Sequence, residues 1–159
     1  MIENLELKKQ SEKILGLIAT ALELFDEDDE MRSHLAKYIC ILCSGFLENS
    51  VSTLYLDFVK DETKSLPVRT YLSVALKGIN NPNSEKLRAV AKNFKPQWET
   101  ELNEFMQKED RSTSVNYIIK DRHKIAHGQD SEITLARIKE HHLKSLEVIS
   151  FIEKQCKAI

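Results

Sequence analysis

Apolar residues recur every three or four positions along most of the chain, which is the spacing of one face of an α-helix. The first such segment covers residues 2–25, with expected inward positions at Leu5, Ile14, Leu15, Ile18, Leu22 and Phe25. The longest segment, residues 31–60, is apolar around much of its circumference, which indicates a central helix with neighbours on several sides. The acidic run at 26–30 lacks the spaced ligands and turn glycine of a calcium loop, so we expect a solvated linker that favours the next helix's N-terminus.

Shorter helices are predicted in the middle of the chain. Pro67 suits the first turn of a helix over roughly 67–77, and Ser84 is the expected N-cap of a helix over 85–94. Residues 78–85 between them have loop composition. Pro96 opens a helix that extends to about Lys108, with an expected inward face of Trp98, Leu102, Phe105 and Met106.

Two further helices complete the predicted fold. One covers residues 111–128, beginning with Ser/Thr capping residues and ending at Gly128, the usual left-handed residue after a helix. The chain is expected to restart at 130–132 as a last helix with the inward stripe Leu135, Ile138, His142, Leu146, Ile149, Ile152 and Cys156. The pattern therefore predicts one all-α domain over 1–159, a bundle of two or three long helices with shorter ones inserted.

Composition agrees with a globular protein: 42% of the 159 residues are apolar and 30% are charged, and four Gly and three Pro leave few turns. A net charge of −2 argues against general nucleic-acid binding over the whole surface, so any phosphate contact must come from a local cluster. The N-terminal segment has acidic residues and no unbroken apolar run, and no window approaches about 18 apolar residues. We expect no signal peptide, no membrane span and a cytoplasmic location.

The three cysteines are expected to be buried small hydrophobes. Cys40 and Cys43 lie in the apolar stretch "YICILCSGFL", and Cys156 lies on the last helix. The CxxC spacing of the first two has no second pair elsewhere in the chain, so it is a weak signal for zinc.

Candidate chemistry concentrates in "IIKDRHKIAHGQD", residues 118–130, where Arg122, His123 and His127 precede Gly128. Arg122 and His127 are separated by ~140° and ~7.5 Å on a helix, so both can border one groove, whereas His123 and His127 share a face. A guanidinium binds two phosphate oxygens at once, and an imidazole exchanges protons near neutral pH. Together these groups are suited to RNA cleavage without metal, with Lys120 and Lys124 adding local attraction.

Two plainer interpretations of this cluster stay open. Cations are favoured near a helix C-terminus, so the run is also typical of a solvated helix end. A pair of histidines four residues apart can hold zinc or nickel, but a third ligand is needed, and Asp121 or the pair His141–His142 would have to provide it.

The run "RHKIAHG", Arg122 to Gly128, resembles the R-x4–6-H signature of the HEPN superfamily of small helical proteins, in which His123 fills the polar position after the arginine. The "IAHG" ending before a polar loop and a long final helix is similar to the RiboL-PSP branch. The segment "ICILCSGFLENSVSTLYLDFV" resembles the apolar helix of that branch with its embedded glutamate, here Glu48. The resemblance covers roughly residues 31–155.

The resemblance implies a homodimer that cleaves RNA without metal or other cofactor, leaving a 2′,3′-cyclic phosphate and a 5′-hydroxyl. Arg122 would stabilise the transition-state charge, His127 would transfer the proton, and His123 would position substrate or orient His127. Glu48 is expected either to pair with Arg122 or to face water, because a buried carboxylate needs a partner.

Tyr117 is the nearest candidate for stacking on a base. His142 and Trp98 are expected to be core residues.

Two functions are consistent with these features. The first is an endoribonuclease, a toxin or antiviral defence effector restrained by an antitoxin or another regulatory partner. The second is a non-catalytic HEPN module that binds RNA or protein.

Overall fold

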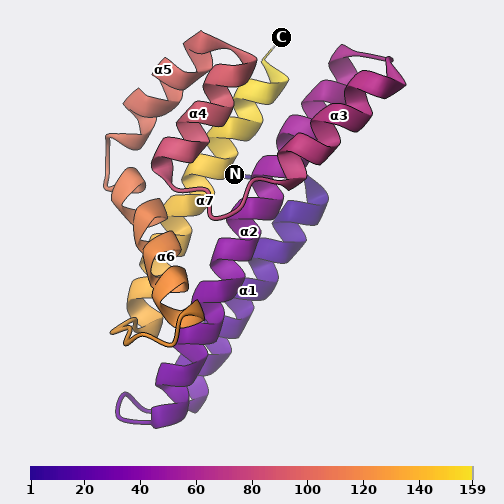
Figure 1. Ribbon diagram of the computed structural model, residues 1–159. Helices are drawn as coiled ribbons and strands as arrows, with labels where there is room; N and C mark the ends of the chain where they lie inside the picture. The colour runs from indigo at the N-terminus through magenta and orange to yellow at the C-terminus, as the bar shows by residue number, and fades with distance from the viewer. Residues whose placement is uncertain (159) are drawn as a thin grey trace.

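The computed structural model describes residues 1–158, which form an elongated helical bundle (Figure 1). Within these residues the chain contains helices and no strand, which confirms the all-α prediction. The helices are α1 (Leu5–Leu24), α2 (Glu30–Glu62), α3 (Leu66–Lys77), α4 (Ser84–Phe94), α5 (Pro96–Met106), α6 (Arg111–Ala126) and α7 (Leu135–Lys157). The predicted domain of residues 1–159 includes Ile159, which lies outside the described residues.

The long helix α2 lies at the centre of the bundle. It contacts α1, α3, α6 and α7, which explains why its sequence is apolar on several sides (Figure 1). One 18-residue window of α2 has a mean hydropathy of 1.4, so by length and composition alone this helix is apolar enough to cross a membrane, contrary to the expectation that no window would be. Since 56% of that window is buried inside the bundle, its apolar character is accounted for by core packing.

The helix ends test the predicted caps. The Asp29 carboxylate accepts a hydrogen bond from the Met31 amide at 2.8 Å, so the acidic linker does favour the start of α2. The N-cap of α4 is Asn83, not Ser84, because the Asn83 side chain accepts from the Lys86 amide at 2.9 Å. The predicted Ser/Thr cap of α6 is wrong: the helix begins after Asp110, whose φ is 57° and whose side chain makes no capping bond.

The inward stripes are mostly as predicted, with one shift in α1. Leu5 is 72% exposed, and Leu7 is buried in its place. This follows from the helical period, because Leu7 lies about two turns before Ile14 on the buried face, whereas Leu5 lies nine positions before Ile14 and about 180° around the helix. Trp98 is in the core, as predicted, and so is His142, whose ring meets the edge of Phe46 at a centroid distance of 5.5 Å.

All three cysteines are buried and free, as expected. The Cys40 thiol donates to the Ile118 carbonyl oxygen on α6 at 3.5 Å. Burial, with the Asp121 carboxylate nearby, raises the pKa of Cys40 to about 12, and burial also raises the pKa of Cys43. These groups are therefore neutral thiols that pack α2 against its neighbours.

Candidate functional site

The C-terminal end of α6 has the geometry that the glycine predicts. Gly128 has a φ of 64°, and its amide donates to the Ile125 carbonyl at 3.2 Å, while the Gln129 amide donates to the Lys124 carbonyl at 2.9 Å. These two bonds form a Schellman motif, which satisfies carbonyls that would otherwise lack partners. His127 is the C-cap residue, so it lies at the point where the chain leaves the helix.

The two histidines of the run lie together on the surface, as their spacing predicts. The ring centroids of His123 and His127 are 4.3 Å apart, and both residues are exposed. Arg122 is partly buried. In the described part of the chain, none of the three side chains makes a hydrogen bond or ion pair, so all three are available to a ligand or to a second molecule.

Asp121 lies beneath these side chains and has a structural role that the sequence analysis missed. It is only 5% exposed, and its carboxylate accepts a hydrogen bond from the Ser131 hydroxyl at 2.9 Å. Lys124 lies 4.0 Å from the same carboxylate. The bond to Ser131 holds the loop after Gly128 against α6. A usable signal was present, since Asp121 follows Ile118 by one turn on the inward stripe of this helix.

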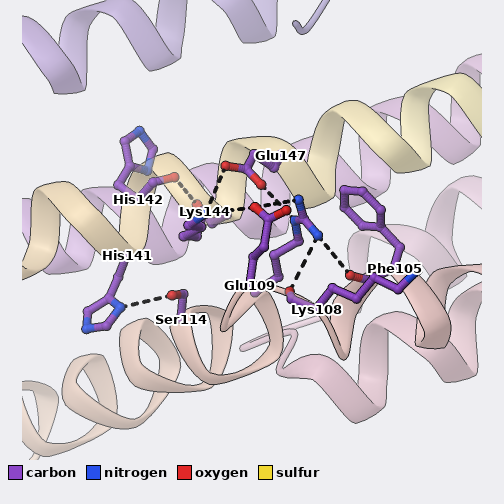
Figure 2. Close-up of polar contacts among 10 residues, drawn as sticks. Phe105, Lys108, Glu109, Ser114, His141, His142, Lys144 and Glu147 are labelled. Atoms are coloured by element: carbon purple, nitrogen blue, oxygen red, sulfur yellow. Dashed lines mark hydrogen bonds and ion pairs between the residues drawn. The ribbon is translucent and has the colours of Figure 1, made fainter.

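A metal site on the histidine pair is not supported. No three His, Cys, Asp or Glu side chains among residues 1–158 are arranged to hold a metal ion. Asp121 is directed to Ser131, and His142 is fully buried in the core. His141 instead bonds through Nδ1 to the Ser114 hydroxyl at 3.0 Å (Figure 2).

Glu48 has a different partner from the one expected. Its carboxylate accepts a hydrogen bond from the Asn81 backbone amide at 2.6 Å, and among residues 1–158 no bond or ion pair joins Glu48 to Arg122. Asn81 has a φ of 49°, a conformation that needs support from its surroundings in a residue other than glycine. The embedded glutamate therefore fastens the loop before α4 to the central helix.

The family is decided by a match over nearly the whole chain. The family model described as RiboL-PSP-HEPN matches residues 5–158. The chain belongs to the RiboL-PSP HEPN family. A comparison with curated proteins found no match, and neither did a comparison with solved structures.

The other residues expected to bind substrate lie on the same HEPN helix, α6, in different settings. Lys120 is exposed and Lys124 partly so, both within reach of solvent. Tyr117 is directed toward α7, where its ring lies 4.1 Å from the His141 ring and the Arg137 guanidinium lies over it at 5.9 Å. Burial and the Asp121 carboxylate raise the pKa of Tyr117. Tyr117 thus packs α6 against α7, and its stacking on a base stays a prediction.

The opposite end of the same HEPN helix carries a second arginine that the sequence analysis missed. Arg111 is 8% exposed, and its guanidinium lies 2.7 Å from a Glu147 oxygen and 3.0 Å from a Glu109 oxygen. It also donates to the carbonyls of Phe105 and Lys108. Figure 2 shows that Glu109, from the turn before α6, and Glu147, from α7, lie close to each other. Each of the three guanidinium nitrogens has a partner in the protein itself, so Arg111 is structural.

Proposed function

We propose that this protein is a metal-independent endoribonuclease whose active site contains Arg122, His123 and His127. The observation that carries the proposal is that these side chains lie at one exposed helix end of a HEPN fold and that none of them has a hydrogen-bond or ion-pair partner among residues 1–158. Buried or ion-paired side chains would be explained by the fold alone. An unpaired guanidinium beside two exposed imidazoles is suited to an anionic ligand such as an RNA phosphodiester.

The proposed reaction transfers the phosphoryl group within the RNA strand. The 2′-oxygen attacks the adjacent phosphorus, its proton passes to an imidazole, and the bond from phosphorus to the 5′-oxygen breaks as that oxygen takes a proton. The products are a 2′,3′-cyclic phosphate and a 5′-hydroxyl. His127 exchanges the protons, Arg122 stabilises the charge that develops on the phosphate oxygens, and His123 orients His127 or the substrate.

A homodimer fits this chemistry better than a single chain. The reaction needs a base for the attacking oxygen and an acid for the leaving oxygen, and two copies of His127 supply both. The exposed helix end leaves room for a second copy of the motif. We further propose that the enzyme acts in the cytoplasm as a toxin or antiviral effector, held in check by an antitoxin or another regulatory protein.

The decisive experiment compares cleavage of mixed RNA by the wild type, Arg122→Ala and His127→Ala in excess EDTA. We expect the wild type to cleave and His127→Ala to lose about 10²–10⁴-fold in rate, the usual contribution of a general acid or base. Arg122→Ala should lose about 10²–10³-fold, the usual contribution of one group that stabilises transition-state charge. His34→Ala is the matched control, because His34 is an exposed histidine on α2 that pairs with Glu30 on its own helix. Intact RNA after incubation with a folded, dimeric wild type would refute the proposal, and loss of wild-type cleavage in EDTA would show a metal enzyme.

The dimer is tested separately by sedimentation of the wild type at micromolar concentration. We expect it to sediment as a homodimer. In a separate experiment, expression of the wild type in a bacterium should inhibit growth, and expression of His127→Ala should not. A species of monomer mass that still cleaves RNA would contradict the composite site.

The second candidate function is RNA binding without cleavage. It is favoured by a lysine-lined groove beside the motif, between α6 and the start of α4, which can hold a phosphate backbone without catalytic geometry. A folded dimer that binds RNA and leaves it intact would support this function.

A further inference from the structure

The groove between α6 and the start of α4 has a volume of about 650 Å³ and ends at the proposed active site. His123 is one of its lining residues, so the groove and the motif share a wall. Lys120 and Lys124 enter from α6, and Lys86 enters from the first turn of α4. A strand leaving the motif on this side would therefore pass directly between the two helices.

The charge of this groove differs from that of the whole protein. Three lysines line it, and Glu85 is the single carboxylate among its lining residues, whereas the chain as a whole carries a net charge of −2. Lys120 is exposed, and the Lys86 ammonium uses only one of its three hydrogens on the Asn80 carbonyl at 2.9 Å. This is the local positive surface that phosphate binding on an acidic protein requires.

The far wall of the groove is held in place by side chains from two other helices. Glu48 of α2 accepts from the Asn81 amide at 2.6 Å, and Asn116 of α6 accepts through Oδ1 from the Ser84 amide at 2.9 Å. These bonds set the loop before α4 and the first turn of α4 against α6. The groove is thus formed before any ligand arrives, which reduces the entropy lost on binding.

From this arrangement we infer that the groove is the binding channel for the single-stranded RNA segment that flanks the scissile phosphate. Lys86, Lys120 and Lys124 contact its phosphates, and Glu48 is a positioning residue that shapes the far wall. No Phe, Tyr or Trp side chain lines the groove, so this channel holds the backbone and contributes little base preference. The inference rests on the proposed function for the identity of the ligand and extends it to residues outside the motif.

The test measures binding of a fully 2′-O-methylated single-stranded RNA, which has no free 2′-hydroxyl and is not cleaved. We expect Lys86→Ala and Lys120→Ala each to weaken binding several-fold and to lower the slope of log K against log salt by about 0.7, the value for one phosphate contact on a single strand. Lys92→Ala is the matched control, since Lys92 is an exposed lysine on α4 that does not line the groove. We expect its affinity and slope to equal those of the wild type.

Glu48 is tested by two substitutions in the same assay. Glu48→Ala removes the acceptor for the Asn81 amide and should weaken binding, whereas Glu48→Gln keeps an acceptor oxygen and should restore most of the affinity. A carboxylate that acts through its charge would not be rescued by glutamine, so equal loss in both variants would overturn the positioning role.

The outcomes separate this inference from the proposed function. Binding that depends on Lys86 and Lys120 in a protein that cleaves no RNA supports the channel and refutes the enzyme. The opposite outcome is that the wild type cleaves RNA while Lys86→Ala, Lys120→Ala and Lys92→Ala all bind the methylated strand as tightly as the wild type. That result overturns the channel and supports the enzyme. Failure of the wild type to bind the methylated strand at low salt overturns the channel as well.

Discussion

Each end of α6 carries an arginine, and the two arginines differ in the hydrogen-bond and ion-pair partners that the fold gives them. Arg111 and Arg122 are eleven positions apart, which is close to three helical turns, so they project in nearly the same direction. Arg111 meets Glu147 of α7, Glu109 and two backbone carbonyls. Arg122, by contrast, makes no side-chain hydrogen bond or ion pair among residues 1–158.

This difference in partners distinguishes an arginine that stabilises the fold from an arginine that can bind a ligand on the same helix. A guanidinium whose donors are all taken by the protein contributes to folding and cannot bind a ligand without breaking those bonds. A guanidinium that the fold leaves unpaired at an exposed end contributes little to folding and is free to bind an anion. The proposed active site lies at the end where the fold supplies no partner.

The most direct test of the difference between Arg111 and Arg122 is to replace each arginine and measure the free energy of unfolding. Arg111→Ala leaves the Phe105 and Lys108 carbonyls without their donor, while Glu109 and Glu147 keep the Lys144 ammonium at 3.2 Å and 3.4 Å. We expect a loss of about 2–3 kcal/mol in the free energy of unfolding, because an acceptor left unpaired inside the protein costs about 1–3 kcal/mol. Arg122→Ala should change it by less than about 0.5 kcal/mol. Urea unfolding of both variants checks this, and equal losses would remove the distinction.

The buried His142 should make the stability of the protein depend on pH, and the exposed His34 serves as its comparison. His142 is fully buried, neither ring nitrogen has a hydrogen-bond partner in the described residues, and burial lowers its pKa from 6.5 to about 4. Between these two pH values the unfolded chain binds a proton that the folded chain does not, so acidification from pH 6.5 toward 4 favours unfolding.

His142→Leu should therefore remove a slope of about 1.4 kcal/mol per pH unit in that window and leave the pH dependence above pH 7 unchanged. Urea unfolding of the wild type and the variant at a series of pH values measures the difference. His34→Leu, at an exposed position, should keep the wild-type slope. Parallel curves for the wild type and His142→Leu would show that this histidine is not held neutral.

The smallest expected effect concerns the turn that ends the motif. An alanine Cβ at Gly128 would meet no atom within 4 Å, so Gly128→Ala causes no steric clash. Its cost is the backbone strain of the positive φ of 64° in a residue with a side chain. We expect a loss of about 1 kcal/mol in unfolding free energy, the strain of a left-handed residue with a side chain. Gly45→Ala, in open space on the exposed side of α2, should instead stabilise the protein by about 0.5–1 kcal/mol. A loss in both variants would point to crowding that the structure does not contain.

Features that depend on neighbours a few residues away could be predicted from the amino-acid sequence. The helical periods, the Schellman ending at Gly128 and the meeting of His123 with His127 all follow from backbone bonds within one or two turns. The burial of Trp98 was also predictable, because an apolar stripe must face the core whatever that core contains.

Which polar side chains form hydrogen bonds or ion pairs with each other depends on the tertiary fold. Glu48 bonds to Asn81, Asp121 to Ser131 across the turn, and Arg111 to Glu147 on another helix. A carboxylate needs a donor within about 3 Å, and which donor comes that close depends on how helices and loops pack, a distance that periodicity does not encode. The same packing gives Arg122 no partner among residues 1–158, a feature that the sequence could not show although it had already singled out this helix end as the candidate site.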